Sequence, residues 1–303
     1  MICGSTAGVC TRSCIAPLDV LKIRMQVQVE STTAWVGGGQ APRGYYQGLV
    51  GSMRTIIKDE GVTGLWRGNV PGSMHWLSYC GLQFATFSTV KGRLAASQQS
   101  PAGAAASSAG LPWWVSFVAG GSGGFVATVS TYPFDLLRTI WTAQGQPKTY
   151  PSLPALCRHL WASGGPLGFF RGLGPTLLQT IPQTATQFAC YNVCKDMRML
   201  DSQYPALNAA ANGLVSGVVA KCVVQPVDVL RKRLQVNGMV RDARYGSQLH
   251  YDGWLHCLRS MMATEGVLGF YKGLGPNLLK IAPASGLTFA IYELAMDEMV
   301  GCV

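Results

Sequence analysis

Long stretches without charged residues alternate with short charged segments along this chain. Four stretches contain no Asp, Glu, Lys or Arg over about the 20 residues that a membrane-crossing helix needs. They are Gly68–Val90, Leu111–Phe134, Pro175–Cys194 and Ser202–Ala220. Histidine and glutamine interrupt some of them, which is typical of helices with one face on lipid and another on a watery cavity. On this pattern alone, buried helices of a soluble all-α protein stay open as an alternative.

An internal repeat argues against that alternative. Three segments start with proline and carry an aspartate two residues later and a base three residues after the aspartate: PLDVLKIR from Pro17, PFDLLRTI from Pro133 and PVDVLRKR from Pro226. Downstream, EGVTGLWRG, GGPLGFFRG and EGVLGFYKG each end in an aromatic–base–glycine triplet. Such fixed offsets predict three copies of one helical unit. We place them at residues 1–95, 113–200 and 201–303, with 96–112 as a flexible linker rich in Ala, Ser and Gly.

Each unit also contains smaller features. Polar connections hold short amphipathic helices, predicted at Leu49–Asp59, Leu153–Ala162 and Trp254–Thr264. Glycines in GxxxG spacing precede the proline segments and favour close helix contacts in a bilayer. Only sixteen residues precede Pro17, which is short for a full span. Either the first helix is incomplete or the sequence starts late.

Composition and charge narrow the class of protein. Of the 303 residues, 48% are hydrophobic and 13% charged, whereas soluble domains carry about a quarter charged residues. The net charge of +10 fits an anionic ligand or anionic lipids. The basic residues form no single tract, so we expect no nucleic-acid partner. The ten cysteines include no CxxC pair, and we expect neither a metal nor another cofactor.

The basic residues outside the spans are unequally divided. The end of the units that carries the proline segments holds most of them: Arg43, Arg54, Lys58, Lys148, Arg158, Arg241, Arg244 and Arg259. The opposite connections hold little beyond Arg93 and Arg198. By the positive-inside rule, the proline end faces the side on which insertion leaves basic loops.

Taken together, Pro-x-Asp-x-x-Lys/Arg and the later aromatic–base–glycine triplet, three times over, resemble the mitochondrial carrier family. The resemblance covers essentially the whole chain. It implies an all-α membrane protein of six transmembrane helices with pseudo-threefold symmetry around a central cavity. It also implies a monomer in the mitochondrial inner membrane, with the proline end and its short helices facing the matrix.

The proline segments have two interpretations. Asp and the base three residues later share a helix face, so local pairs worth about 0.5 kcal/mol are one possibility. The resemblance implies instead a matrix gate of pairs between helices, with glutamine braces beside them. Its expected pairs are Asp19 with Arg138, Asp135 with Arg231 and Asp228 with Lys22, and its expected braces are Gln26 and Gln235. Thr142 holds the third brace position and is too short for this role.

The resemblance implies two further sites. A cytoplasmic gate on the even-numbered spans would be reduced here to one pair, Lys195 with Glu293. The triplet regions would bind cardiolipin phosphates through Arg67, Gly68, Arg171, Gly172, Lys272 and Gly273. A cation beside helix N-termini suits a phosphate. The alternative is that these are turn and interface-anchor residues.

Family positions place the substrate contacts at His75, Trp76, Gln179, Thr180 and Lys280. Lys280 is the full charge within the last span, and a cation deep in a cavity favours an anionic ligand; His75 could equally be a neutral packing residue. The second and third units are most similar to members that carry thiamine pyrophosphate. We therefore expect this small anionic substrate, exchanged for nucleotides by alternating access, with an adenine nucleotide or coenzyme A as alternatives. A membrane enzyme is disfavoured, because no catalytic constellation or phosphate loop occurs.

Overall fold

The computed structural model describes residues 2–29, 45–46, 48–98, 113–196, 205–239, 250–281 and 283. Five long helices run through these residues: α1 (Ile2–Val27), α3 (Asn69–Gln98), α4 (Trp113–Ala143), α6 (Leu173–Asp196) and α7 (Pro205–Gln235). Shorter α-helices are α2 (Leu49–Glu60), α5 (Leu153–Gly164), α8 (Trp254–Glu265) and α9 (Leu274–Leu279). Three 3-10 turns, η2 (Val62–Trp66), η3 (Gly165–Phe170) and η5 (Val267–Tyr271), follow α2, α5 and α8. The described part is thus all-helical, without a β-strand.

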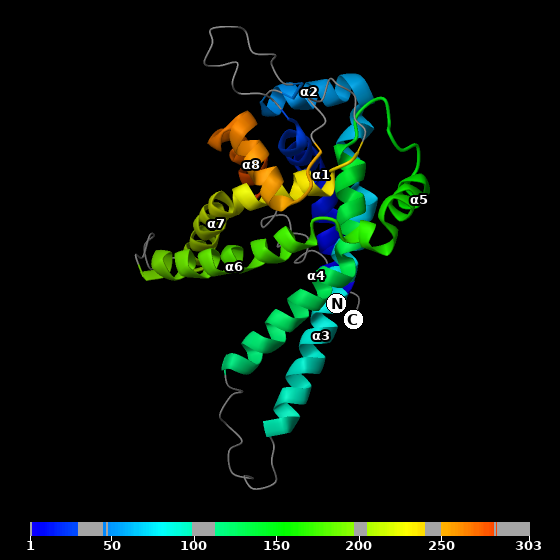
Figure 1. Cartoon of the computed structure of the whole chain (residues 1–303). Helices are drawn as coiled ribbons and strands as arrows, with labels where there is room; N and C mark the ends of the chain where they lie inside the picture. Colours follow the sequence, from blue (N-terminus) through cyan, green and yellow to red (C-terminus); the bar gives the residue numbers. More distant parts are fainter. Residues whose placement is uncertain are drawn as a thin grey trace, which may run out of the picture.

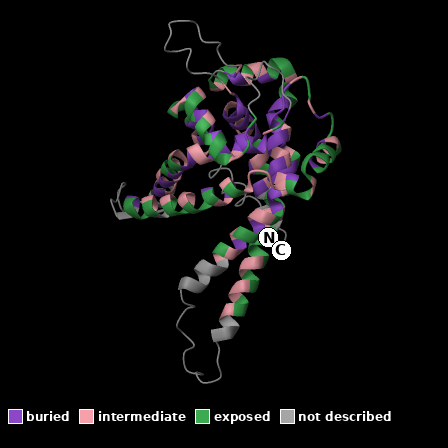
Figure 2. Ribbon diagram, viewed as in Figure 1, coloured by how far each residue is buried: buried purple, intermediate pink, exposed green. Residues whose placement is uncertain are grey.

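The long helices form two hairpins that diverge from a common base (Figure 1). In one hairpin α3 contacts α4 along its length, and in the other α6 contacts α7. At the base α1 contacts α3, α4, α7 and α9, which brings the three units together. Buried residues gather where α1, α4 and α7 meet, whereas the described residues of the hairpins away from this junction are mostly exposed or half-buried (Figure 2).

The three short helices confirm the predicted amphipathic segments, each ending one or two residues later than expected. Each ends at a glycine, Gly61, Gly165 and Gly266, with φ between 57° and 74°, a conformation that disfavours other residues. This turn leads directly into the 3-10 segment and so to the aromatic–base–glycine triplet. Helix α3 continues to Gln98, and residues 99–112 of the predicted linker lie outside the described residues, so the linker and the bounds of the three units stay a prediction.

The proline segments lie inside their helices. Pro17, Pro133 and Pro226 fall within α1, α4 and α7, which continue for several residues past each proline. The motif's aspartates and bases are therefore helical and project from the last turns of each helix. Side chains of these last turns belong to a buried apolar cluster. It includes Tyr132, Leu136 and Ile140 of α4 together with Leu156 and Leu160 of α5.

By length and hydropathy, one described stretch qualifies on its own as a membrane span, Ala211–Gln235 in α7. The core helix of a soluble protein can have the same length and hydropathy, so this stretch alone does not distinguish a membrane protein from a soluble one.

Candidate functional site

Three ion pairs join the proline helices at the base of the structure. Lys22 of α1 lies 2.6 Å from Asp228 of α7, and Arg138 of α4 lies 2.6 Å from Asp19 of α1. Arg231 of α7 closes the cycle at 2.5 Å from Asp135 of α4. The six side chains are at most 17% exposed. Every pair thus connects two different repeats, and none is a local pair within one helix.

The two predicted glutamine braces contact the carboxylates of this ring. Gln26 donates to Asp228 at 3.1 Å, and Gln235 donates to Asp135 at 2.8 Å. The third brace position, Thr142, instead donates to the carbonyl of Arg67 at 3.0 Å. Asp19 therefore has no amide brace from this position, and its second partner is a cation.

That cation is Lys280, at the end of α9. Its Nζ lies 2.8 Å from Asp19 Oδ1, while Arg138 occupies Oδ2 of the same carboxylate. Gln179 of α6 is 5% exposed and donates to Asp228 at 3.4 Å. Two of the predicted substrate contacts therefore touch the ring of ion pairs directly, each at a different aspartate.

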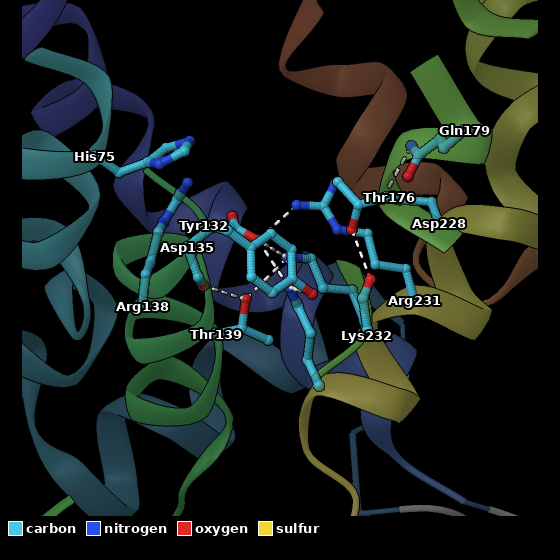
Figure 3. Close-up of polar contacts among 12 residues, drawn as sticks. His75, Tyr132, Asp135, Arg138, Thr139, Thr176, Gln179, Asp228, Arg231 and Lys232 are labelled. Atoms are coloured by element: carbon cyan, nitrogen blue, oxygen red, sulfur yellow. Dashed lines mark hydrogen bonds and ion pairs between the residues drawn. The ribbon is translucent and has the colours of Figure 1, made fainter. Parts of the chain in front are cut away.

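The remaining predicted contacts lie beside the ring. His75 Nδ1 is 3.2 Å from the carbonyl of Thr131, one turn before Asp135. Trp76 is 38% exposed, and Thr180, also exposed, bonds only the carbonyl of Thr176 within its own helix, at 3.1 Å. Figure 3 shows His75 and Arg138 on the α3–α4 side and Gln179 beside Asp228 on the α6–α7 side. Of the five positions, Lys280 and Gln179 thus contact the ring carboxylates, whereas His75 contacts the backbone of α4.

Sequence reasoning missed a cation inside the ring, Lys232. It is 7% exposed and donates to Thr139 at 2.8 Å and to Gln235 at 3.0 Å, with Asp135 at 3.6 Å (Figure 3). The other proline segments have Ile23 and Thr139 at this position, so the repeat pattern gave no signal. Asp135 therefore has two cationic partners, Arg231 and Lys232, as Asp19 has Arg138 and Lys280.

The glycines of the aromatic–base–glycine triplets lie against the brace positions of the next repeat. A β-carbon on Gly68 would be 2.1 Å from Thr142 Oγ1, and one on Gly273 would be 2.9 Å from Gln26 Cγ. On Gly172 it would meet Tyr132 Oη at 2.9 Å and Gln235 Cγ at 3.3 Å. All three have positive φ, between 73° and 85°. These glycines therefore permit the contact between neighbouring repeats.

The bases of the triplets bind the C-terminal carbonyls of the neighbouring proline helix. Arg67 donates to the carbonyl of Gln144 at 3.0 Å, Lys272 to that of Gln28 at 3.4 Å, and Arg171 to that of Asn237. Cations near a helix C-terminus satisfy carbonyls that lack a partner in the helix. The six residues predicted to bind lipid thus also join the repeats.

Two of the three units add a buried arginine–glutamate pair to this junction. Arg24 meets Glu60 at 2.6 Å, and Arg233 meets Glu265 at 2.7 Å; all four side chains are at most 1% exposed. Arg67 and Lys272 contact the same two glutamates at 2.9 and 3.1 Å. The middle unit has Ile140 and Gly164 at these positions.

Because the middle unit lacks the buried arginine–glutamate pair, Arg171 has no carboxylate partner among the described residues. It borders a cavity of about 810 Å³ between the second and third units. The cavity is lined by the starts of α6 and α8 and the connection between α7 and α8, including Gly172, Asn237, Gly238, Tyr251 and Gly253. The start of α8 has no side-chain cap, so its backbone N–H groups can bind an anion there.

The predicted cytoplasmic gate is not tested by the structure. Lys195 belongs to α6, but its side chain is outside the described part, and Glu293 lies in the undescribed residues 284–303. The pair stays a prediction.

Comparison with known proteins decides the family. The family model described as "mitochondrial carrier protein" matches three consecutive segments, residues 1–98, 109–201 and 202–301. The chain belongs to the mitochondrial carrier family. It is therefore a carrier, not an enzyme, and a multi-pass protein of the mitochondrial inner membrane.

Several curated members are similar to this carrier over nearly its whole length. Mitochondrial thiamine diphosphate carrier 1 of Arabidopsis thaliana is 36% identical, over 97% of this chain and 92% of that protein. Mitochondrial thiamine pyrophosphate carrier 1 of Phaeosphaeria nodorum is 40% identical, over 99% and 92%. The protein of the same name in Neurospora crassa is 40% identical, over 97% and 89%.

Proposed function

We propose that this carrier transports thiamine pyrophosphate across the mitochondrial inner membrane by alternating access, in exchange for nucleotides. The names of its similar relatives support the substrate. The observation that carries the chemistry is the pairing of Asp19 with two cations, Lys280 and Arg138. A diphosphate entering the cavity can replace the carboxylate as the partner of Lys280, since phosphate oxygens accept strong hydrogen bonds from cations.

The other predicted contacts suit the rest of this substrate. Trp76 is partly exposed, and an aromatic face attracts cationic rings. Gln179 and Thr180 offer polar atoms, although Gln179 must first leave Asp228. His75 adds a ring nitrogen that the carbonyl of Thr131 already contacts. Substrate binding therefore competes with the contacts that hold the ring.

The ring of Asp19–Arg138, Asp135–Arg231 and Asp228–Lys22, with Gln26 and Gln235, acts as the matrix gate in this proposal. Removing one partner of a buried pair is costly, about 3–5 kcal/mol, and the three pairs are all largely buried. Opening the gate requires that substrate contacts offset part of this cost. Lys195 and Glu293 form the cytoplasmic gate of the alternate state.

The architecture that fits this function has six crossing helices: α1, α3, α4, α6, α7 and a sixth that begins with α9. The three units span residues 1–95, 113–200 and 201–303, joined by 96–112, and the carrier works as a monomer. Support comes from the cyclic order of the ion pairs, in which each unit contacts both others.

Cardiolipin binds the matrix-side triplets in this proposal, most strongly at Arg171 and Gly172. The cavity beside Arg171 and the uncapped start of α8 support this choice. At Arg67 and Lys272, by contrast, Glu60 and Glu265 already provide a carboxylate partner. The other positions, Gly68 and Gly273, contribute backbone N–H groups.

Uptake by reconstituted liposomes tests the substrate. Labelled thiamine pyrophosphate should enter liposomes loaded with unlabelled thiamine pyrophosphate or ATP, and excess unlabelled substrate should compete. ATP, coenzyme A and inorganic phosphate serve as competitors and as labelled alternatives. Uptake of one of these in the absence of thiamine pyrophosphate uptake would refute the assignment. Matched liposomes without protein give the background.

A further inference from the structure

Two cations on the proline helices have no place in the ring of ion pairs. Arg12 of α1 and Lys221 of α7 both stand five residues before their proline, Pro17 and Pro226, and the equivalent residue of α4 is Thr128. Both cations are partly buried inside their helices. Neither has a carboxylate within ion-pairing distance among the described residues. Such charges within a span are costly and usually serve a function.

Arg12 lies next to a second guanidinium. A β-carbon built on Gly72 would be 2.9 Å from Arg138 Nε and 3.5 Å from Arg12 Nη2, so both arginines lie over this glycine. The other units have Thr176 and Asn277 at the position of Gly72. Arg12 also lies 5.8 Å from the ring centre of Trp76. The first unit thus makes room for two converging cations at a predicted substrate contact.

Lys221 of α7 lies among other cations, in the neighbourhood of Asp228. It is repelled electrostatically by Lys22, Lys280 and Arg231, and Asp228 is the acid that attracts it. The helices that carry Arg12, Lys221 and Lys280 contact one another, α1 with α7 and α9, and α7 with α9. Asp19 and Asp228 are already bonded to ring cations. The positive charge around this wall of the cavity therefore exceeds the charge of its carboxylates.

We propose that Arg12 and Lys221, together with Lys280, bind the phosphate groups of the transported solute along the wall formed by α1, α7 and α9. The inference deepens the proposed function by assigning two substrate-binding residues to it. An anion with several phosphate oxygens can accept from all three cations and relieve their mutual repulsion. The uncharged wall with Thr128, Gln179 and Thr180 then faces the part of the solute without phosphate.

Inhibition by inorganic pyrophosphate tests this site independently of the solute's other parts. Uptake of whichever phosphorylated solute the wild-type carrier transports is measured with increasing pyrophosphate. Arg12→Gln and Lys221→Gln should each weaken inhibition about tenfold or more, because a hydrogen bond to a charged group is lost. Arg12→Lys should retain most of it. The matched control is Lys58→Gln, which removes an exposed cation on α2. Pyrophosphate should inhibit uptake by this variant as strongly as it inhibits the wild type.

The outcomes separate the two proposals. Wild-type uptake of ATP but not thiamine pyrophosphate overturns the proposed substrate, and the variants are then compared on ATP. Pyrophosphate inhibition unchanged in Lys221→Gln, with normal wild-type uptake, overturns the phosphate site and leaves the substrate assignment intact. Thermal unfolding in detergent checks the fold of each variant. If Arg12→Gln lowers the unfolding temperature, Lys221→Gln alone tests the phosphate site. Lys221 bonds no acceptor among the described side chains, so its replacement breaks no such contact.

Discussion

At the residue scale, three glycines control how closely neighbouring repeats approach. Gly68, Gly172 and Gly273 all have positive φ. A β-carbon on any of them would contact the side chain at a brace position. Any other residue would combine backbone strain with a collision. Because the three units share this backbone conformation and this close contact, a glycine follows the base in each of them.

Gly172→Ala should destabilise the carrier by about 1–3 kcal/mol, because alanine disfavours positive φ and its methyl group would meet Tyr132 and Gln235. Thermal unfolding in detergent measures the change. Gly174→Ala is the control, since a β-carbon there has nothing within 4 Å. Equal unfolding temperatures for the two variants would contradict the proposed role of Gly172.

Cysteine reactivity offers a second test at this scale. Cys257 of α8 is 0% exposed, and burial raises the pKa of its thiol to about 12. The thiolate, which is the reactive form, is therefore scarce at pH 7–9. Iodoacetamide should leave Cys257 unmodified in the folded carrier at these pH values and modify it after unfolding, as peptide mass spectrometry would report. Rapid modification of Cys257 in the folded protein at pH 8 would disprove the burial of this face of α8.

At the element scale, the short helices differ in how they are attached. Glu60 at the end of α2 and Glu265 at the end of α8 each neutralise a buried arginine of the preceding proline helix. In the middle unit, α5 contributes Leu156 and Leu160 to an apolar cluster with Ile140 instead. Because the middle unit lacks both the arginine and the glutamate, it contains no buried member of this pair without its partner. The middle attachment is therefore apolar where the outer two are ionic.

Glu265→Gln should lower the stability by about 3 kcal/mol or more, because Arg233 would stay buried without its carboxylate partner. Chemical or thermal unfolding in detergent measures this loss. Asp252→Asn provides the control, as the Asp252 side chain is 81% exposed, and its effect should stay within about 0.5 kcal/mol. A loss no larger than the control's would show that the pair contributes little.

Much of the helical arrangement could be predicted from the sequence, since periodic patterns and repeats are local signals. The short helices and the partners Asp19–Arg138, Asp135–Arg231 and Asp228–Lys22 are of this kind. The role of Lys232 could not, because it occurs in one repeat and depends on contacts with Thr139 and Gln235 across helices. Arg12 and Lys221 did leave a signal, a shared offset of five residues before a proline. Their closeness to Arg138 and Lys280 required coordinates.

The contact between Lys280 and Asp19 is a further feature that sequence spacing could not reveal. The two residues are separated by 261 positions, and the sequence predicts Lys280 as a substrate contact without indicating a carboxylate partner for it. Its ion pair makes the predicted substrate contact and the predicted gate share one carboxylate. Whether a position contacts a ligand or a protein group depends on packing between distant helices, which local pattern does not encode.

At the scale of the whole molecule, one end is held together and the other diverges. The ring of ion pairs, its braces and the buried arginine–glutamate pairs all lie where the three units meet, and the α3–α4 and α6–α7 hairpins separate away from it (Figures 1 and 2). The central claim is that this ring closes the proline end of a cavity that opens towards the hairpin ends. On this claim, we expect substrate that reaches Lys280 and Gln179 to weaken the ring, since both residues contact its aspartates.

Thiol accessibility tests this claim most directly. In a carrier whose own cysteines are replaced by serine, His75→Cys places a reporter beside the ring, on its cavity side. A membrane-impermeant thiol reagent should label it from the hairpin side and not from the proline side. Adding Asp135→Asn and Asp228→Asn should allow labelling from the proline side, whereas adding Asp252→Asn should not. Labelling from the proline side with the ring intact, or no gain when both aspartates are replaced, would contradict the account.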